Sequence, residues 1–344
     1  MGQNVKKIDC KKDDKNRMIK KEIKAKKEVK ETEIKCTKCK KRDAVVDLGY
    51  VKSDLCSPCF IDYFENRIYR ANREFGMLQH GEKIGVGVSG GKDSAALLYV
   101  LTKVAKHVGA ELVPILIDEG IKGYRDKAAE KAEALCKQLG LKLNRVSYQE
   151  VFGITMDKAV KKKDKVKWRG ACSYCGVFRK TALNKAAYDF GCKKLAIGHN
   201  ADDMAQTILM NFMKSEPARF MRFGALSGIV ERDKFVMRVK PLIYVTEHEC
   251  AVYCTLRNLP FHLQECPYSS DSFRGELKDF LNKVESKHPG TKFNILKSFM
   301  ALKELMVASP VKEKDLKHCT KCGAPCSSGD NCKACALADE LNSA

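Results

Sequence analysis

Seventeen cysteines stand out among the residues of this 344-residue sequence that can do chemistry. Eight of them form two quartets, each built from two C-x-x-C pairs. Four thiolates at such spacing are the ligand set of a closed tetrahedral zinc site, which is structural and supplies folding energy to a small module. We expect Cys326 to stay outside the second quartet. The predicted zinc ligands are Cys36, Cys39, Cys56 and Cys59 in the first site and Cys319, Cys322, Cys332 and Cys335 in the second.

A third C-x-x-C pair, Cys172 and Cys175, has no second pair beside it and cannot close a tetrahedral site alone. A third thiolate would leave one iron of an iron–sulfur cluster open to an external ligand. Two alternatives remain: a redox pair that alternates between disulfide and persulfide, and a structural pair without chemistry. The candidates for the third thiolate are Cys192, Cys250, Cys254 and Cys266, of which Cys250 and Cys254 have the i, i+4 spacing of small core residues.

A glycine-rich turn, SGGKDS at 89–94, follows the apolar run IGVGV at 84–88 and begins a helix-like stretch. Gly90 and Gly91 let backbone N–H groups approach an anion, and the helix N-terminus attracts it. Hydroxyl groups can donate to phosphate oxygens, and an ammonium group can neutralise them. An acidic residue here suits Mg²⁺ or a backbone cap. The expected nucleotide-binding residues of this turn are Val88, Ser89, Gly90, Gly91, Lys92, Asp93 and Ser94.

Two better-known phosphate-binding patterns fit this turn poorly. The dinucleotide fingerprint would place Gly85 and Gly87 inside the strand rather than in the turn, and no acidic residue follows about 20 positions on. The Walker A pattern fails because Val86 stands at its first glycine and Asp93 replaces its Ser or Thr.

Two further groups of polar residues follow apolar runs. Asp118 ends the run at 112–117, and GHNADD at 198–203 ends the run at 194–198. Open parallel sheets bind ligands at the carboxyl ends of their strands, so we expect Asp118, Gly198 and His199 to contact a nucleotide. Asp202 or Asp203 could hold Mg²⁺ or act on the substrate, or both could cap the helix.

These residues need a scaffold, and the apolar pattern predicts one. Strand-like runs at 84–88, 112–117, 141–146 and 194–198 alternate with helix-like stretches at 94–107, 125–139, 176–190 and 202–214. Such alternation predicts an α/β fold with a parallel sheet covered on both faces. Residues 60–80 have helical spacing, and 271–306 read as one or two helices around Pro289-Gly290.

The sequence is strongly basic, with 64 Lys and Arg against 43 Asp and Glu and a net charge of +21. Nucleic acid is the first expected partner of such a chain. Six basic residues at 161–169 flank Trp168, which we expect either to stack on an unpaired base or to pack into the core. Arg219, Arg222 and Arg238 add basic character. The absence of a long apolar run predicts no membrane partner and a cytoplasmic location.

The turn at 89–94 resembles the PP-loop of the ATP pyrophosphatase superfamily, which adenylates substrates and releases pyrophosphate. Together with C-x-x-C-G at 172–176, GHNADD at 198–203 and the Cys266-Pro267 pair, it makes residues 36–335 similar to the tRNA 2-thiouridine synthetases. This family holds the archaeal and eukaryotic-cytoplasmic tRNA 2-thiolation proteins and the TtuA-like enzymes. The two terminal zinc modules favour this uridine branch over the enzymes that thiolate tRNA cytidine.

The resemblance implies that Cys172, Cys175 and Cys266 hold a 4Fe-4S cluster, that Asp203 is an acidic catalytic residue, and that Arg179 or Lys180 is a basic one, beside Lys92. It implies ATP with Mg²⁺ as cofactors, tRNA as substrate, and a ubiquitin-like sulfur-carrier protein or free sulfide as donor. It also favours a homodimer. The expected domains are a basic flexible arm (1–35), a zinc finger with a helix (36–80), the PP-loop catalytic domain (81–270), a helical segment (271–310) and a second zinc finger (311–344).

We therefore expect an ATP-dependent tRNA sulfurtransferase that makes 2-thiouridine, with the wobble uridine favoured over the T-loop uridine. A PP-loop tRNA ligase without cluster chemistry is the alternative enzyme, but it gives no use for the three cysteines. A zinc-finger RNA-binding module is the non-enzyme alternative, but it leaves the phosphate-binding turn without a purpose.

Overall fold

The computed structural model describes residues 34–227, 234–269, 273–307, 317–326 and 329–344. The predicted arm at 1–35 lies almost entirely outside these residues. The chain divides into two compact units, residues 1–48 with 52–59 and residues 49–51 with 60–344. In the first unit, strands β1 (Val46–Leu48) and β2 (Ser53–Leu55) pair antiparallel, next to the first cysteine quartet.

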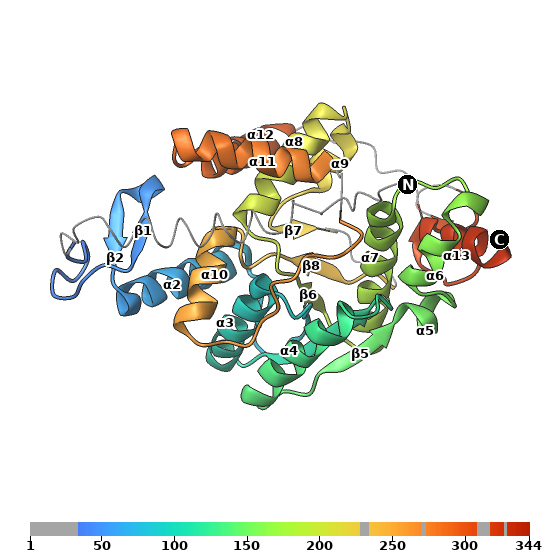
Figure 1. Cartoon of the computed structure of the whole chain (residues 1–344), viewed down its shortest axis with the longest axis horizontal. Coiled ribbons are helices and arrows are strands. Elements are labelled where there is room, and N and C mark those ends of the chain that lie inside the picture. Colours follow the sequence, from blue (N-terminus) through green and yellow to red (C-terminus); the bar gives the residue numbers. More distant parts are fainter. Residues whose placement is uncertain (1–33, 228–233, 270–272, 308–316, 327–328) are drawn as a thin grey trace, which may run out of the picture. The chain divides into compact units, whose positions relative to one another are not determined.

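The second unit is an α/β fold around a six-stranded sheet in the order β5-β4-β3-β6-β8-β7 (Figure 1). All neighbouring strands are parallel except the edge pair β7–β8, which is antiparallel. The strands are β3 (Lys83–Gly87), β4 (Glu111–Asp118), β5 (Asn144–Ser147), β6 (Lys194–Ala196), β7 (Leu226–Ser227) and β8 (Met237–Val239), and a separate pair is formed by β9 (Lys317–His318) and β10 (Pro325–Cys326).

The strand order reverses at β3. The chain runs outward from β3 through β4 to β5 and then returns to place β6 on the other side of β3. Loops that follow β3 and β6 therefore leave the sheet side by side at their carboxyl ends, which is where open α/β sheets bind ligands. Both the phosphate-binding turn and the GHNADD segment start at this point.

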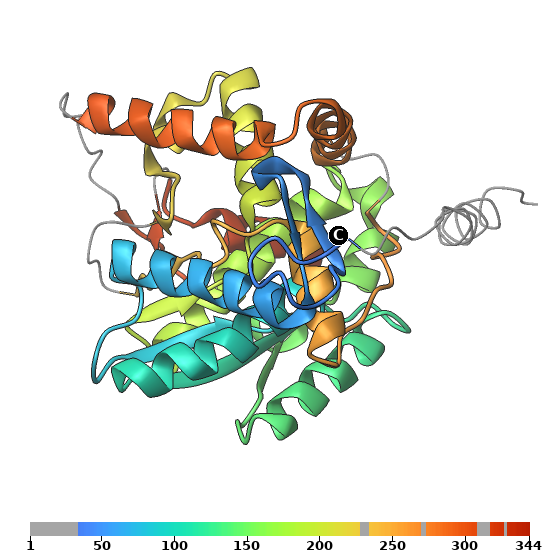
Figure 2. The same cartoon turned by 90° about the vertical axis from the view of Figure 1, so that its left-hand side faces the viewer.

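Helices cover the sheet, and further helices pack on those helices. Helices α11 and α12 lie beside α8, and the two views agree on this (Figures 1 and 2). The helices of the described residues are α2 (Ser57–Phe75), α3 (Lys92–Val108), α4 (Arg125–Gln138), α5 (Tyr148–Phe152), α6 (Met156–Lys161), α7 (Ala171–Asp189), α8 (Ala201–Met213), α9 (Pro217–Arg222), α10 (Glu247–Leu256), α11 (Phe273–Lys287), α12 (Thr291–Val307) and α13 (Lys333–Ser343), with 3-10 turns η1 (Gly49–Val51) and η2 (Lys163–Lys165). Within this part of the chain, every helix is too short or too polar to cross a bilayer.

The main core lies between one face of the sheet and α7. Ile115 and Ile117 of β4 point to this face and pack with Tyr174 and Phe178 of α7, and all four side chains are buried. The aromatic rings of Tyr148 and Phe178 meet edge to face at 5.7 Å. Burial of this many apolar side chains is the main source of stability for such a sheet and fixes α7 against it.

The predicted strands and helices are confirmed, with shifts of a few residues at most ends. The largest errors are five residues: α2 ends at Phe75 rather than at 80, and α7 begins at Ala171 rather than at 176. Gly170 has a φ of 83°, which lets the chain turn directly into the helix, and the i, i+4 pair Tyr174 and Phe178 buries its first turns. Cys172 and Cys175 are consequently helical residues and not loop residues.

Candidate active site

The phosphate-binding turn is closed by its own hydroxyl groups. The amide of Ser89 donates to Ser94 Oγ at 3.1 Å, and Ser94 Oγ donates to the carbonyl of Gly91 at 2.9 Å. Gly90 has a φ of 85°, and a Cβ there would lie 2.0 Å from the carbonyl oxygen of Ala128. The turn therefore requires glycine and presents backbone amides at the start of α3, which is a preformed anion site. Buried Val88 anchors it, because the backbone N–H of Val88 donates a hydrogen bond to the carbonyl of Ile115 at 2.8 Å.

The charged residues of this turn are paired with one another. Lys92 Nζ lies 2.9 Å from a carboxylate oxygen of Glu247 and 3.2 Å from Asp93. Burial works against the charge of Lys92, but the two carboxylates outweigh it and raise the pKa of this lysine. Asp93 also accepts a hydrogen bond from Asn200 Nδ2 at 3.1 Å, so the turn after β3 and the segment after β6 are joined.

The two adjacent aspartates of the GHNADD segment have different surroundings. Asp202 is buried and forms an ion pair with Lys292 of α12. Asp203 belongs to a capping box with Asn200 at the start of α8, and its nearest cation, Arg274, is 3.7 Å away. Burial raises the pKa of Asp203 to about 6, and Arg274 offsets part of this effect. Asp202 is therefore engaged in packing, whereas Asp203 is the carboxylate available at the site.

His199 and Gly198 precede these aspartates. Desolvation and the positive charges of Lys240 and Arg274 lower the pKa of His199, although the residue is exposed at the surface. Its predicted contact with a nucleotide stays a prediction. A Cβ on Gly198 would lie 3.3 Å from the amide of Ser94, so the missing side chain permits the close approach of the two loops.

Asp118 caps the loop that follows β4. Its Oδ1 accepts from the amide of Gly120 at 2.9 Å, and its Oδ2 lies 3.4 Å from Arg145. The predicted contact of Asp118 with a nucleotide stays a prediction.

The three predicted cluster cysteines lie on two segments that meet. Cys172 Sγ donates to the carbonyl of Tyr268, two residues past Cys266, at 3.5 Å. Cys175 accepts from Arg179 Nη2 at 3.1 Å. Burial raises the pKa of Cys175, and Arg179 offsets part of it; burial also raises the pKa of Cys266.

The Cys266 segment is also tied to the phosphate-binding turn. The amide of His262 donates to the carbonyl of Gly90 at 2.8 Å, and His262 pairs with Gly91 as a parallel β-bridge. The third cysteine is therefore four residues from a backbone pair with the turn, which brings the thiols and the anion site to one side of the sheet.

Within the described ranges, the only groups of three or more sulfurs that all lie within 4.8 Å of one another are the two quartets. The trio is more widely spaced than that. Four sulfurs on one zinc at about 2.3 Å lie about 3.8 Å apart. The trio is therefore not arranged around a single zinc ion as the two quartets are.

The other candidate thiols do not join the trio. Cys254 is buried under the phosphate-binding turn, where its Sγ donates to the carbonyl of Lys92 at 3.2 Å. Cys250 is buried on the same helix, α10, and Cys192 packs in the core beneath the sheet. These three behave as core residues, which leaves Cys266 as the third thiol.

Of the two adjacent basic residues on α7, only Arg179 contacts a cysteine of the trio. Lys180 lies among other cations, and its pKa is lowered by burial and by Arg238 and Arg274. Arg179 also binds Glu119, a buried residue of the DEG segment after β4 to which sequence reasoning assigned no role. Its position next to Asp118 at the end of a buried strand was the available signal.

The donor sets of the two quartets suit zinc. In each group the four sulfurs lie within 4.8 Å of one another. Burial works against thiolates, yet backbone amides lower the pKa of Cys36 to about 6 and that of Cys319 to about 6. Amides that favour the thiolate are what a metal site needs. Cys326 is buried outside the second quartet, with its Sγ 3.6 Å from the carbonyl of Gly329.

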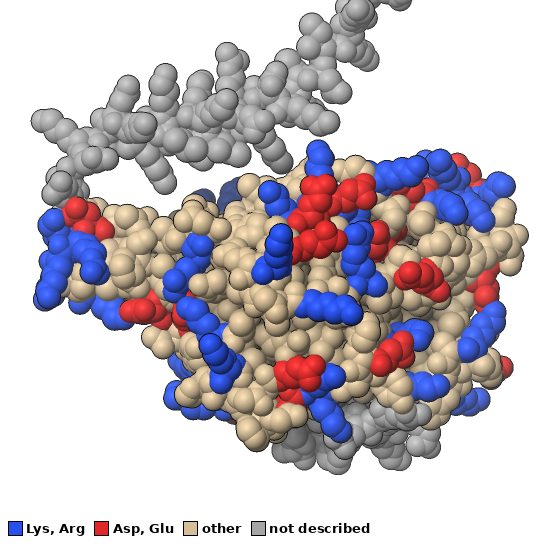
Figure 3. Space-filling view, turned by 90° about the horizontal axis from the view of Figure 1, so that it is seen from below, with Lys and Arg blue, Asp and Glu red and all other residues tan. Residues whose placement is uncertain are grey.

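The basic segment before Cys172 is used for packing. Trp168 stacks on Tyr174 with ring centroids 4.6 Å apart, which supports the core interpretation of this tryptophan. Lys162 Nζ donates to the carbonyl of Leu341 in α13 at 2.7 Å. On the face shown in Figure 3, Lys and Arg side chains are interspersed with Asp and Glu rather than gathered into one patch.

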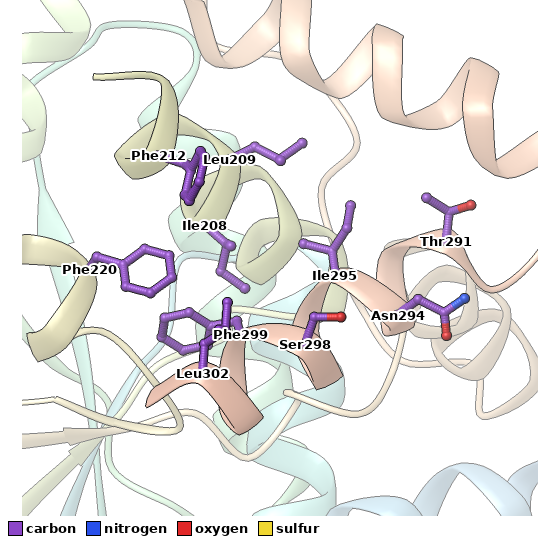
Figure 4. A pocket seen from close by; sticks show the side chains of 10 residues that line it. All are labelled: Ile208, Leu209, Phe212, Phe220, Thr291, Asn294, Ile295, Ser298, Phe299 and Leu302. Atoms are coloured by element: carbon purple, nitrogen blue, oxygen red, sulfur yellow. The ribbon is translucent and has the colours of Figure 1, made fainter. Parts of the chain in front are cut away.

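An apolar cavity of about 380 Å³ lies away from these groups, between α8, α9 and α12 (Figure 4). Phe220 and Phe299 meet edge to face inside it at 4.7 Å, and Phe212 at its rim is 71% exposed. Its lining has no charged side chain. A triphosphate therefore belongs at the turn after β3 and not in this cavity.

Comparison with known proteins agrees with this geometry. A PP-loop domain model matches residues 63–285. The tRNA 2-thiolation protein NcsA of Haloferax volcanii is 38% identical over 322 residues, which are 90% of this chain and 99% of that protein. The tRNA-5-methyluridine(54) 2-sulfurtransferase of Pyrococcus horikoshii is 37% identical over 312 residues, or 90% and 96% of the two chains. Among solved structures, the U34-tRNA thiolase NcsA from Methanococcus maripaludis with its 4Fe-4S cluster gives a TM-score of 0.75 at 30% identity, covering 89% of this chain and 96% of that one.

Proposed function

The chain belongs to the PP-loop family of tRNA 2-thiolation proteins, and from this premise we propose that it is an ATP-dependent tRNA uridine 2-sulfurtransferase. The observation that carries the proposal is the junction of two sites. The anion-binding turn at 89–94 is hydrogen-bonded through His262 to the segment that bears Cys266. Tyr268 of the same segment accepts a hydrogen bond from Cys172. An activated base can meet a nucleotide and a sulfur in one cavity only if these sites are adjacent.

ATP binds with its β- and γ-phosphates on the turn that contains Gly90 and Gly91. The uridine C2 oxygen attacks the α-phosphorus, pyrophosphate leaves, and the base becomes adenylated. Lys92 exchanges its carboxylate partners for phosphate oxygens and offsets the charge that develops on them. Sulfur then attacks C2, and AMP leaves with the former C2 oxygen.

The trio Cys172, Cys175 and Cys266 fits a 4Fe-4S cluster by donor type, and the segments that carry these cysteines are in contact. When bound, the cluster would supply one iron position without a cysteine, at which sulfur can be held. The protein holds Arg179 against Cys175. Asp203 lies at the start of α8 in a capping box with Asn200, which donates to Asp93 of the phosphate-binding turn.

Two metals, a sulfur donor and a second copy of the chain complete the proposal. Asp93, whose charge helps to raise the pKa of Asp203, would together with Asp203 hold Mg²⁺ or act on the substrate. Each cysteine quartet would hold one structural Zn²⁺. The sulfur comes from a ubiquitin-like carrier protein or from free sulfide, and the enzyme acts as a homodimer in the cytoplasm, where the free thiols of the described residues stay reduced.

The wobble uridine is the proposed target, with the T-loop uridine as the alternative. One relative is named for position 34 and another for position 54, so both sites are served by proteins similar to this chain.

The test is thiolation of unmodified tRNA by protein purified and reconstituted without oxygen, with ATP and sulfide, followed by mass spectrometry of the nucleosides. We expect 2-thiouridine at position 34 that depends on ATP. Cys172→Ala should abolish thiolation and leave ATP binding intact. Cys192→Ala is the matched control, because it also removes one thiol, but from the core and outside the trio. It should leave thiolation unchanged.

Thiolation by the Cys172→Ala protein at the wild-type rate would refute the role of the trio. Release of pyrophosphate with tRNA but without sulfur incorporation would favour a PP-loop ligase instead.

A further inference from the structure

Glu119 lies immediately after β4 and is almost completely buried, with 2% of its side chain exposed. Its two carboxylate oxygens face two different arginines. Oε1 accepts from Arg179 Nε at 2.8 Å, and Oε2 lies 2.8 Å from Arg125 Nε. Burial of a carboxylate between two guanidinium groups carries a large desolvation cost. We therefore expect a role of Glu119 beyond packing.

Each arginine connects Glu119 to one half of the site. Arg125 is buried and donates from Nη1 to the carbonyl of Ser89, in the phosphate-binding turn, at 2.9 Å. Arg179 donates from Nη2 to Cys175 Sγ at 3.1 Å. A continuous series of contacts therefore runs from Ser89 through Arg125, Glu119 and Arg179 to Cys175.

The two arginines are held differently. Arg125 has carbonyl partners at both Ser89 and Ile117 in addition to Glu119, so its position does not depend on the carboxylate alone. Arg179 is half exposed, and its hydrogen bonds within the described part of the chain go to Glu119 from Nε and to Cys175 from Nη2. Without Glu119, the weak acceptor Cys175 would be the one hydrogen-bond partner left among these residues to orient this long side chain.

We propose that Glu119 is a positioning residue for sulfur transfer. It fixes the Arg179 guanidinium against Cys175, and through Arg125 it ties this position to the phosphate-binding turn. This inference rests on the proposed function, because it assigns Arg179 to the step in which sulfur replaces the adenylated oxygen. Because Nε and Nη2 are engaged with Glu119 and Cys175, Nη1 is the nitrogen that the guanidinium offers to AMP as AMP leaves C2 of the base.

The test compares Glu119→Gln with Glu249→Gln. Glu249 is an equally buried carboxylate, 1% exposed, paired with Arg67 at 2.8 Å. It also accepts hydrogen bonds from the hydroxyl of Tyr50 and the amide of Thr246. Both variants lose a buried charge, so both should lower the melting temperature. Only Glu119→Gln should lower kcat for thiolation, by at least tenfold, while its Kd for ATP changes less than threefold.

A second readout does not require turnover. Hydrogen bonds to cluster sulfurs raise a cluster's reduction potential, so Glu119→Gln and Arg179→Met should both shift it in the negative direction, and Glu249→Gln should not. Because Glu119 acts through Arg179, the double variant should be no slower than Arg179→Met alone, within twofold. If Glu119→Gln does not fold, Arg179→Lys replaces it, since this residue is half exposed and an ammonium group cannot bind both partners.

Multiplicative losses in the double variant, or equal kcat in Glu119→Gln and Glu249→Gln, would overturn the inference and leave the sulfurtransferase proposal standing. A wild-type protein that binds a cluster but makes no 2-thiouridine would instead refute the proposed function.

Discussion

Asp202 and Asp203 are neighbours in sequence, and the structure predicts that they can be separated experimentally into a residue for stability and a residue for activity. Lys292 Nζ contacts the Asp202 carboxylate and donates to Asn282 Oδ1 at 2.7 Å, with the two charged side chains 10% and 7% exposed. The pair ties the start of α8 to α12. Asp203 has no such partner in the described residues beyond Arg274 at 3.7 Å.

The perturbation is Lys292→Met, which keeps the length of the side chain and removes its charge. It leaves the carboxylate of Asp202 buried, with the amide of Glu247 at 2.8 Å as its remaining donor. Removal of one partner from a buried ion pair costs about 3–5 kcal/mol. At about 2 °C per kcal/mol for a unit of this size, the melting temperature should fall by about 6–10 °C.

The assay is thermal unfolding followed in parallel with tRNA thiolation. The double variant Asp202→Asn with Lys292→Met should recover most of the lost stability, because both charges are gone. Asp203→Asn should lower thiolation at least tenfold without lowering the melting temperature. A fall of less than 2 °C for Lys292→Met, or a destabilised Asp203→Asn protein, would refute this division of roles.

Three further outcomes are expected. Gly90→Ala should weaken ATP binding at least tenfold by calorimetry, because Gly90 has a positive φ and a Cβ there would lie 2.0 Å from the carbonyl oxygen of Ala128. Gly91→Ala should bind ATP normally, because Gly91 has a φ of −85° and a Cβ there would lie 3.5 Å from Ser89 Oγ. Equal affinities would contradict the geometry of the turn. Thiolation should fall as the pH drops through about 6, where Asp203 becomes protonated. Because the pKa of this carboxyl is higher in the folded chain than its ordinary value of 3.8, the same group makes the fold more stable as the pH decreases from 6 toward 4. A flat rate down to pH 5 would exclude the ionised form of Asp203 from the reaction. Metal analysis should find two zinc ions per chain, and Cys319→Ser should reduce this to one and lower the melting temperature; a full complement of zinc in that variant would show that the second quartet is not a metal site.

The sequence was sufficient for those features that depend on neighbouring residues. Apolar runs such as 112–117 predicted the parallel sheet, because strands buried on both faces are continuously apolar. Cysteine spacing predicted both quartets that the fold brings together. Gly90 and Gly91 predicted a turn that brings backbone amides close to an anion, and Gly90 has the positive φ that glycine adopts readily.

Features that depend on tertiary contacts were not accessible in the same way. Lys292 and Asp202 are 90 positions apart, and nothing local distinguishes Lys292 from the other lysines of the chain. The edge strands β7 and β8 have three residues or fewer and form through pairing rather than through an apolar pattern. Trp168 shows the limit most clearly, because its stacking on Tyr174 requires the turn at Gly170 that starts α7.

Helix α13 follows directly from Cys332 of the second quartet and packs on α7, the helix whose first turn carries Cys172 and Cys175. Asn342 of α13 also donates to the carbonyl of Phe152 at 2.9 Å. With zinc bound at the second quartet, as proposed, a cell short of zinc would therefore lose the support that α13 gives to α7. The supply of one metal would then set how well the proposed cluster is held, and thiolation of tRNA would decline with zinc while iron remained plentiful.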